Sequence, residues 1–222
     1  MIDRPSGSIP VSGIDTLMMK DNDLIVFSDD WGRHPFSCQH IIKRFLPDNN
    51  VIWVNSIGYR SMKLDLYDLK RAYEKIWNWV MSPASKQGKE ILARNFHVLN
   101  PPCLPFGSIP AVRRLNTWSI VSSVRKAMKV QHLYRPIVIT TLPTASDFMG
   151  AFDEKLSVYY CVDDFTQWPG VDGELTRTME ETLLRKVDLI IATSEKLQRT
   201  RLNGKRPTQL LTHGVDVEHF RC

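Results

Sequence analysis

Residues 156–164 read LSVYYCVDD, and this stretch decides the fold that the sequence predicts. Aliphatic, aromatic and small residues fill it as far as Val162, which is typical of a buried β-strand. Side chains on its two sides alternate along the chain, with Leu156, Val158, Tyr160 and Val162 on one side and Ser157, Tyr159 and Cys161 on the other. The strand then stops abruptly at two carboxylates, Asp163 and Asp164.

The residues that follow complete a βαβ unit. Residues 165–173, FTQWPGVDG, are rich in turn residues, and they lead into an amphipathic helix expected over 173–187. A second apolar strand is expected over 188–192. In such units the loops at the carboxyl ends of the strands face the ligand crevice. The two aspartates and Trp168 are therefore expected where the chemistry takes place.

The helix expected over 173–187 has an apolar side and an acidic side. Its inward side is predicted to carry Leu175, Met179, Leu183, Leu184 and Val187. Its outward side is predicted to carry Glu174, Glu180 and Glu181.

The order of strand, loop and helix recurs along the rest of the chain. Further strands are expected over 23–27, 51–55, 96–99, 136–140 and 208–211, and further helices over 36–46, 63–81, 113–131 and 195–202. This alternation predicts an α/β fold, a doubly wound and mostly parallel sheet with helices on both faces. Residues 1–21 are rich in Ser, Gly and Pro and are expected to form a flexible tail, and no linker divides residues 22–222.

Composition narrows the class of protein. Hydrophobic residues make up 43% and charged residues 24% of the 222 residues, which is ordinary for a soluble globular protein. The formal net charge of +5 suits an anionic partner such as a nucleotide, a phospholipid surface or nucleic acid, without selecting one. The groove code and stacking aromatics of a nucleic-acid reader are not evident, so no nucleic-acid partner is expected.

Cysteine spacing and hydropathy indicate the compartment. The four cysteines are scattered without CxxC spacing, which predicts neither a zinc site nor a disulfide framework and fits a reducing cytoplasm. No apolar run approaches the roughly 20 residues of a membrane span. We expect a cytoplasmic protein, and we leave open a peripheral contact at the inner face of the membrane.

The loop after the first expected strand concentrates groups that bind polar ligands. Trp31, Arg33 and His34 lie ahead of the helix expected over 36–46, where an anion or an acceptor would be favoured. The loop contains only one glycine, Gly32, so it lacks the G-x-G-x-x-G pattern of a dinucleotide site, and no P-loop is present. No cofactor and no metal are expected.

Two expected helices have a second interpretation. The helix over 113–131 is basic through Arg113, Arg114, Arg125, Lys126 and Lys129, which suits either an anionic-lipid patch or a solvated face. The helix over 63–81 carries Trp77 and Trp79 near its end, which suits either a membrane-facing or acceptor-facing edge or core packing.

Three segments resemble a known family. YYCVDDFTQWPG (159–170), LLRKVDLIIATSEKL (183–197) and LLTHGVDVEHF (210–220) occur in the order seen in the N-terminal domain of bacterial GT-B glycosyltransferases, of the family 4-like (group 1) type that builds surface polysaccharides. Thr212 and His213 stand where the family usually has Pro and Asn. The resemblance implies a Rossmann-like domain, the N-terminal half of a GT-B fold.

The resemblance also implies what is missing. In this family the active site lies between two domains, and the second domain binds most of the nucleotide sugar. The chain stops at Cys222, where that C-terminal donor domain would begin, so we expect either a fragment that is inactive alone or a stand-alone half.

The resemblance assigns expected roles to residues. Asp163 and Asp164 would act in catalysis or accept hydrogen bonds from sugar hydroxyls, although aspartates at such positions also cap loops. The expected substrate-binding residues are Trp31, Arg33, His34, Thr141, Trp168, His213 and Gly214. Trp168 would stack on a sugar ring or pack under its loop.

The implied activity is transfer of a sugar from a nucleotide-sugar donor to a glycan or a lipid-linked acceptor in polysaccharide biosynthesis. Two alternatives stay open. One is a nucleotide-sugar epimerase of GT-B fold, and the other is a non-catalytic module that binds a sugar or a nucleotide.

Overall fold

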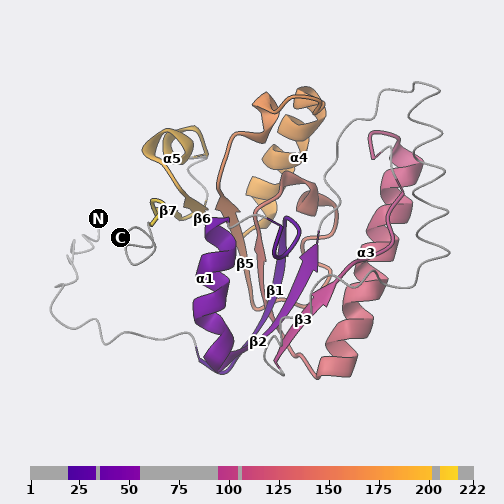
Figure 1. Cartoon of the computed structure of the whole chain (residues 1–222). Coiled ribbons are helices and arrows are strands. Elements are labelled where there is room, and N and C mark those ends of the chain that lie inside the picture. The colour runs from indigo at the N-terminus through magenta and orange to yellow at the C-terminus, as the bar shows by residue number, and fades with distance from the viewer. Residues whose placement is uncertain (1–19, 34–35, 56–94, 105–106, 202–205, 215–222) are drawn as a thin grey trace, which may run out of the picture.

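A computed structural model describes residues 20–33, 36–55, 95–104, 107–201 and 206–214. Seven parallel strands form one sheet in the order β3-β2-β1-β4-β5-β6-β7 (Figure 1). They are β1 (Asn22–Ser28), β2 (Asn49–Asn55), β3 (Phe96–Leu99), β4 (Ile137–Thr140), β5 (Leu156–Cys161), β6 (Leu189–Ala192) and β7 (Thr208–Leu210). This order and the parallel pairing are those of a doubly wound, Rossmann-like α/β fold, which confirms the predicted fold class.

Helices cover both faces of the sheet. The described α-helices are α1 (Ser37–Phe45), α3 (Pro110–Gln131), α4 (Gly173–Lys186) and α5 (Glu195–Arg201). Helix α1 lies on one face, while α3 and α4 lie on the other (Figure 1). After β1 the chain adds β2 and β3 on one side of β1, and after β4 it adds β5, β6 and β7 on the other side of the sheet. Because both kinds of crossover are right-handed, α1 and α4 lie on opposite faces.

Two apolar layers fill the space between the sheet and its helices. On the α1 face, Val158 and Tyr160 of β5 pack in one cluster with Cys38 and Ile42 of α1. On the opposite face, Tyr159 and Cys161 pack in a second cluster with Val124 and Ala127 of α3 and with Leu183 of α4. Alternate residues of 156–161 thus contribute to the apolar layers on both sides of the sheet, as expected of a strand that is buried on both faces.

Among the described elements, the largest differences from the sequence prediction lie in two places, while most other ends shift by one or two residues. Helix α3 starts at Pro110, three residues before the expected start, because proline is well tolerated in a first helical turn. Residues Pro143–Asp147, expected as a loop, form the short 3-10 helix η2. The other described 3-10 helices are η1 (Leu46–Asp48), which follows α1, and η3 (Phe165–Gln167), which follows β5.

Several expected features lie outside the described residues. These are most of the N-terminal tail, the helix over 63–81 with its two tryptophans, His34, and the last part of the third family-like segment. Within the described part of the chain, no helix has the length and apolar character needed to cross a bilayer.

Candidate functional site

The carboxyl ends of all seven strands lie along one edge of the sheet, because every neighbouring pair is parallel. The loops after β1, β4, β5 and β7 carry the predicted site residues, so these residues follow strand ends on a common edge. In open α/β sheets this edge is where ligands bind, next to the point where the strand order reverses. Here that point lies between β1 and β4.

At the reversal point the predicted residue Thr141 is fully engaged inside the protein. Its hydroxyl donates a hydrogen bond of 2.9 Å to the Ser28 hydroxyl, and its backbone N–H donates one of 3.0 Å to the Phe27 carbonyl. Both Ser28 and Thr141 are buried. Thr141 therefore ties the β1 and β4 ends together.

Asparagine side chains fix the loop after β1. The backbone N–H of Trp31 donates to Asn55 Oδ1 at 2.9 Å, and Asn55 Nδ2 donates to Asn100 Oδ1 at 2.8 Å. The Trp31 ring packs against Trp53 and Phe96, with ring centroids 4.7 Å and 4.5 Å apart. The ring of the predicted residue Trp31 thus packs on side chains of β2 and β3.

Two other groups in this loop differ in their surroundings. Arg33 is exposed and forms an ion pair of 3.6 Å with Asp30. Trp31 Nε1 is buried and has no hydrogen-bond partner among the described residues. His34 lies outside the described residues.

The loop after β5 brings Asp163 and Trp168 together. Trp168 Nε1 donates a hydrogen bond of 2.8 Å to Asp163 Oδ2, and the backbone N–H of Asp164 donates one of 2.7 Å to Asp163 Oδ1. The Trp168 ring rests on Phe165 at 4.9 Å, yet 41% of the residue stays exposed. The loop therefore presents an aromatic surface beside a carboxylate.

Asp164 instead caps the loop and faces a cation. Its Oδ1 accepts hydrogen bonds from the Thr166 hydroxyl at 2.7 Å and from the Thr166 backbone N–H at 3.3 Å. Arg201 Nη2 donates to the same oxygen at 3.2 Å. The Thr166 hydroxyl bond is the main cause that lowers the pKa of Asp164, and Arg201 adds to it against a burial effect of opposite sign. The carboxylate is thus a weak proton acceptor at neutral pH.

A buried charge network lies below this loop. Arg201 Nε and Nη2 donate to Glu180 Oε1 and Oε2 at 3.0 Å and 2.9 Å, and Tyr159 Oη donates to Glu180 Oε1 at 2.7 Å. The side chains of Arg201 and Glu180 are each 9% exposed. Strand β5, helix α4 and helix α5 are thereby joined, and Arg201 extends the connection to Asp164.

The outward position predicted for Glu180 is wrong. Glu180 is buried because it lies on the side of α4 that covers β5, between Met179 and Leu183, where Tyr159 and Arg201 satisfy its oxygens. Sequence reasoning also missed Arg201. The available signal was indirect: the buried hydroxyl of Tyr159 requires a partner, which is Glu180, and a buried carboxylate in turn requires a cation.

Burial and hydrogen bonding shift the pKa values of Arg201, Tyr159 and Cys161 in and beside this network. Burial acts to lower the pKa of Arg201, but the hydrogen bonds and charge of Glu180 outweigh it, and the net direction is upward. Burial raises the pKa of Tyr159 well above its usual value, with further contributions from Cys161 and Glu180. Burial also raises the pKa of Cys161 to about 11, so this thiol is no ready nucleophile.

The last predicted residues follow β7. His213 and Gly214 are exposed on the segment that leaves this strand, which is two strands from β5 in the sheet order. The backbone N–H of Leu211 donates to the Ala192 carbonyl at 2.9 Å, so the pairing with β6 extends to this residue. Among the described residues, no group of three or more His, Cys, Asp or Glu side chains is arranged to hold a metal.

Comparison with known proteins gives weak structural likenesses, and two of the similar structures are described below. No protein-family model and no curated protein sequence matches the chain. A UDP-glucosyltransferase from Polygonum tinctorium, capable of glucosylating indoxyl and solved in complex with 3,4-dichloroaniline, is similar with a TM-score of 0.44 and 10% identity over 90% of this chain and 54% of that one. The N-terminal domain of Candida albicans trehalose-6-phosphate phosphatase is similar with a TM-score of 0.49 and 12% identity over 93% of this chain and 51% of that one.

The chain thus spans about half the length of both structures. At these identities and TM-scores, neither likeness bears on the substrate or the reaction of this chain.

Proposed function

We propose that this chain is the N-terminal, acceptor-side domain of a glycosyltransferase of GT-B fold, related to the bacterial family 4-like enzymes. The proposed reaction transfers a sugar from a nucleotide-sugar donor to a glycan or a lipid-linked acceptor in polysaccharide biosynthesis, on the cytoplasmic side. The observation that carries the proposal is the pair formed by Asp163 and the half-exposed Trp168 at the carboxyl edge. The three family-like segments support it.

The chemistry of this pair suits a sugar. A carboxylate has about four lone-pair sites, and two of those on Asp163 are already used by Trp168 and by the backbone of Asp164. The remaining sites are open to sugar hydroxyls. The apolar face of a sugar ring would rest on the indole, as apolar groups commonly rest on aromatic rings in ligand sites.

The proposal assigns different roles to the two aspartates. Asp163 would contact the acceptor and accept the proton or hydrogen bond of its attacking hydroxyl. Asp164, held by Thr166 and Arg201, would fix the shape of the loop. Arg33, His34, His213 and Gly214 would contact the donor phosphates or the acceptor, and a second domain, on this or another polypeptide, would bind most of the donor.

The test is equilibrium binding by isothermal titration of a panel of oligosaccharides to wild-type protein and to variants. Trp168→Ala and Asp163→Asn should each weaken binding at least tenfold, because each removes one half of the pair. Trp118→Ala, which removes an exposed indole on another surface, is the matched control and should leave binding unchanged. Equal losses in all three variants, or none in the first two, would contradict the proposal.

One observation favours a second candidate, a non-catalytic sugar-binding module. Asp164 is ion-paired and its pKa is lowered, which leaves Asp163 as the better base of these two adjacent aspartates. Product analysis separates the two functions. A new glycosidic bond formed from a nucleotide sugar supports the transferase, whereas saturable sugar binding without any product in the presence of the donor-binding domain supports the module.

A further inference from the structure

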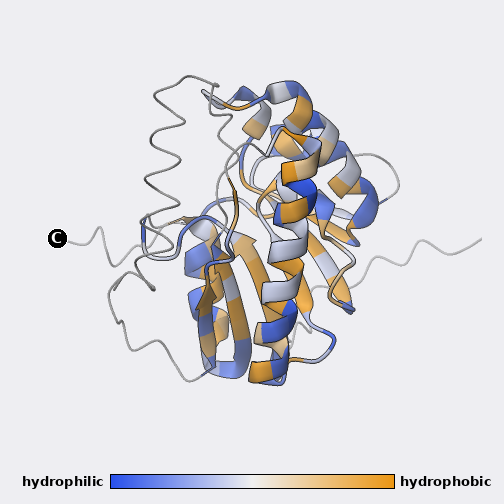
Figure 2. Ribbon diagram, turned by 90° about the vertical axis from the view of Figure 1, so that its right-hand side faces the viewer, coloured by the Kyte–Doolittle hydropathy of each residue, from blue (hydrophilic) through white to orange (hydrophobic). Residues whose placement is uncertain are grey.

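Helix α3 presents an unusual outer surface. Its 22 residues, PAVRRLNTWSIVSSVRKAMKVQ, include five basic residues and no acidic one. Its inner side packs on the sheet through Val124 and Ala127. Figure 2 looks onto this helix, and both hydrophilic and hydrophobic segments lie on the side that it turns to the viewer.

Large apolar side chains lie on that outer side. Trp118 is 68% exposed and Leu115 is 50% exposed. Val130, at the C-terminal end of the helix, is also exposed. Leu115 and Trp118 are three residues apart, so they are neighbours on one helix face. An isolated exposed apolar residue is ordinary, but a tryptophan and a leucine side by side form a patch that suits an interface.

Cations that form no ion pair with another described residue flank these apolar side chains. Arg113 is paired with Asp147 at 3.0 Å, and Arg125 donates to the Ala151 carbonyl at 2.8 Å and 3.1 Å. None of the ion pairs among the described residues involves the other three basic residues of the helix, which are Arg114, Lys126 and Lys129.

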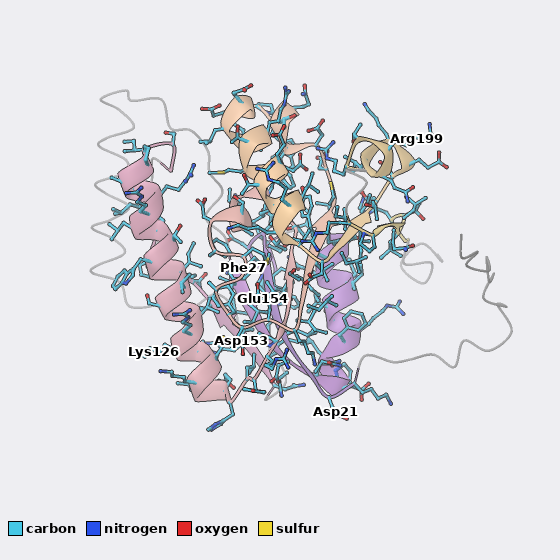
Figure 3. All side chains as sticks on the ribbon, turned by 180° about the vertical axis from the view of Figure 1, so that it is seen from behind. Asp21, Phe27, Lys126, Asp153, Glu154 and Arg199 are labelled. Carbon is cyan, nitrogen blue, oxygen red and sulfur yellow. The ribbon has the colours of Figure 1, made fainter. Side chains whose placement is uncertain are left out.

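The helical spacing places these cations on the same side as the patch. Arg114 lies four residues before Trp118, and Lys126 lies four residues before Val130, so each pair shares a face. Lys126 is on the side of α3 that points away from the sheet (Figure 3). Of the acidic residues after β4, Asp147 is paired with Arg113, and the carboxylate of Glu154 accepts hydrogen bonds from the backbone N–H groups of Gly150 and Phe152.

We propose that the outer face of α3, formed by Arg114, Leu115, Trp118, Lys126, Lys129 and Val130, docks on an anionic lipid bilayer. Tryptophan and leucine enter the headgroup boundary, and lysine and arginine attract anionic headgroups, which is the pattern of helices that lie in a membrane surface. A protein partner would have to supply a matching acidic and apolar groove, whereas an anionic bilayer offers both properties at once. This inference does not depend on the proposed transferase activity.

The experiment is co-sedimentation of the whole chain with vesicles of phosphatidylcholine alone and of phosphatidylcholine mixed with phosphatidylglycerol. Binding is expected only to the mixed vesicles and should weaken as salt is raised. The double variant Lys126→Glu/Lys129→Glu should bind at least roughly 25-fold more weakly, at about fivefold for each lost cation. Trp118→Ser should also weaken binding and should abolish any blue shift of the tryptophan emission.

The matched control is Arg177→Glu/Lys196→Glu, on the exposed sides of α4 and α5. Both double variants lower the formal net charge from +5 to +1, since each reversal removes two charges. The control should bind like wild type. Equal losses in both double variants, equal binding to both kinds of vesicle, or a dimer that Trp118→Ser converts to a monomer would overturn the proposal.

Discussion

The guanidinium of Arg201 holds the carboxylate of Glu180 through two hydrogen bonds, of 3.0 Å and 2.9 Å, and both side chains are 9% exposed. Breaking a buried pair by removing one partner leaves the other charge uncompensated, which typically costs roughly 3–5 kcal/mol. We therefore expect Glu180→Gln to lower the free energy of unfolding by an amount of that order. Urea unfolding measures it.

The control for this prediction is an exposed pair of the same chemistry. Arg199 and Glu195 form an ion pair of 2.9 Å on α5, with side chains 76% and 69% exposed. Glu195→Gln should change stability very little. A similar loss of unfolding free energy in the two variants would show that burial of the Arg201–Glu180 pair adds nothing to its contribution to stability.

The Asp164 carboxylate should make stability depend on pH. Its pKa is lower in the folded protein than in an unfolded chain, chiefly because of the Thr166 hydroxyl bond. The stability that it contributes is therefore present above the unfolded value, about 3.9, and is lost as the pH falls through the folded value. We expect Asp164→Asn to flatten the decline in stability below about pH 4. Unfolding in urea at a series of pH values checks this, and parallel curves for the two proteins would refute it.

Thr141 should matter for stability more than for binding. Thr141→Val keeps the shape of the side chain but removes the donor to the buried Ser28 hydroxyl, which should cost roughly 1–2 kcal/mol. Thr141→Ser keeps the hydroxyl and should cost less. If Thr141→Val weakens sugar binding at unchanged stability, the hydroxyl contacts ligand as the sequence suggested.

Much of the sheet could be predicted from the sequence because its strands are short apolar runs that end at polar loops. The β3 prediction matches the observed Phe96–Leu99, and the stretch that begins at Leu156 forms the strand β5 between β4 and β6. Once the strands are parallel, topology alone gathers the loops after them at one edge.

The chemistry at that edge was harder to predict because it depends on contacts between distant segments. Helical periodicity treats any glutamate as an outward residue, so it could not place Glu180 against Arg201, 21 residues later. The packing of the Trp31 indole on Trp53 and Phe96 also joins segments that are distant in the sequence. By contrast, Asp163 and Trp168 are only five residues apart, and a turn was enough to bring them together.

The central claim is that the loop after β5 binds a sugar, and the indole N–H of Trp168 is its most direct reporter. The measurement is a titration of the nitrogen-15-labelled chain with oligosaccharides, UDP-glucose and GDP-mannose, followed by the indole signals in NMR spectra, with Trp168→Phe to assign the signal. We expect a saturable shift of the Trp168 signal with at least one ligand, while the signal of Trp118 stays in place. A Trp168 signal that does not move with any ligand, or that moves only as much as that of Trp118, would contradict it.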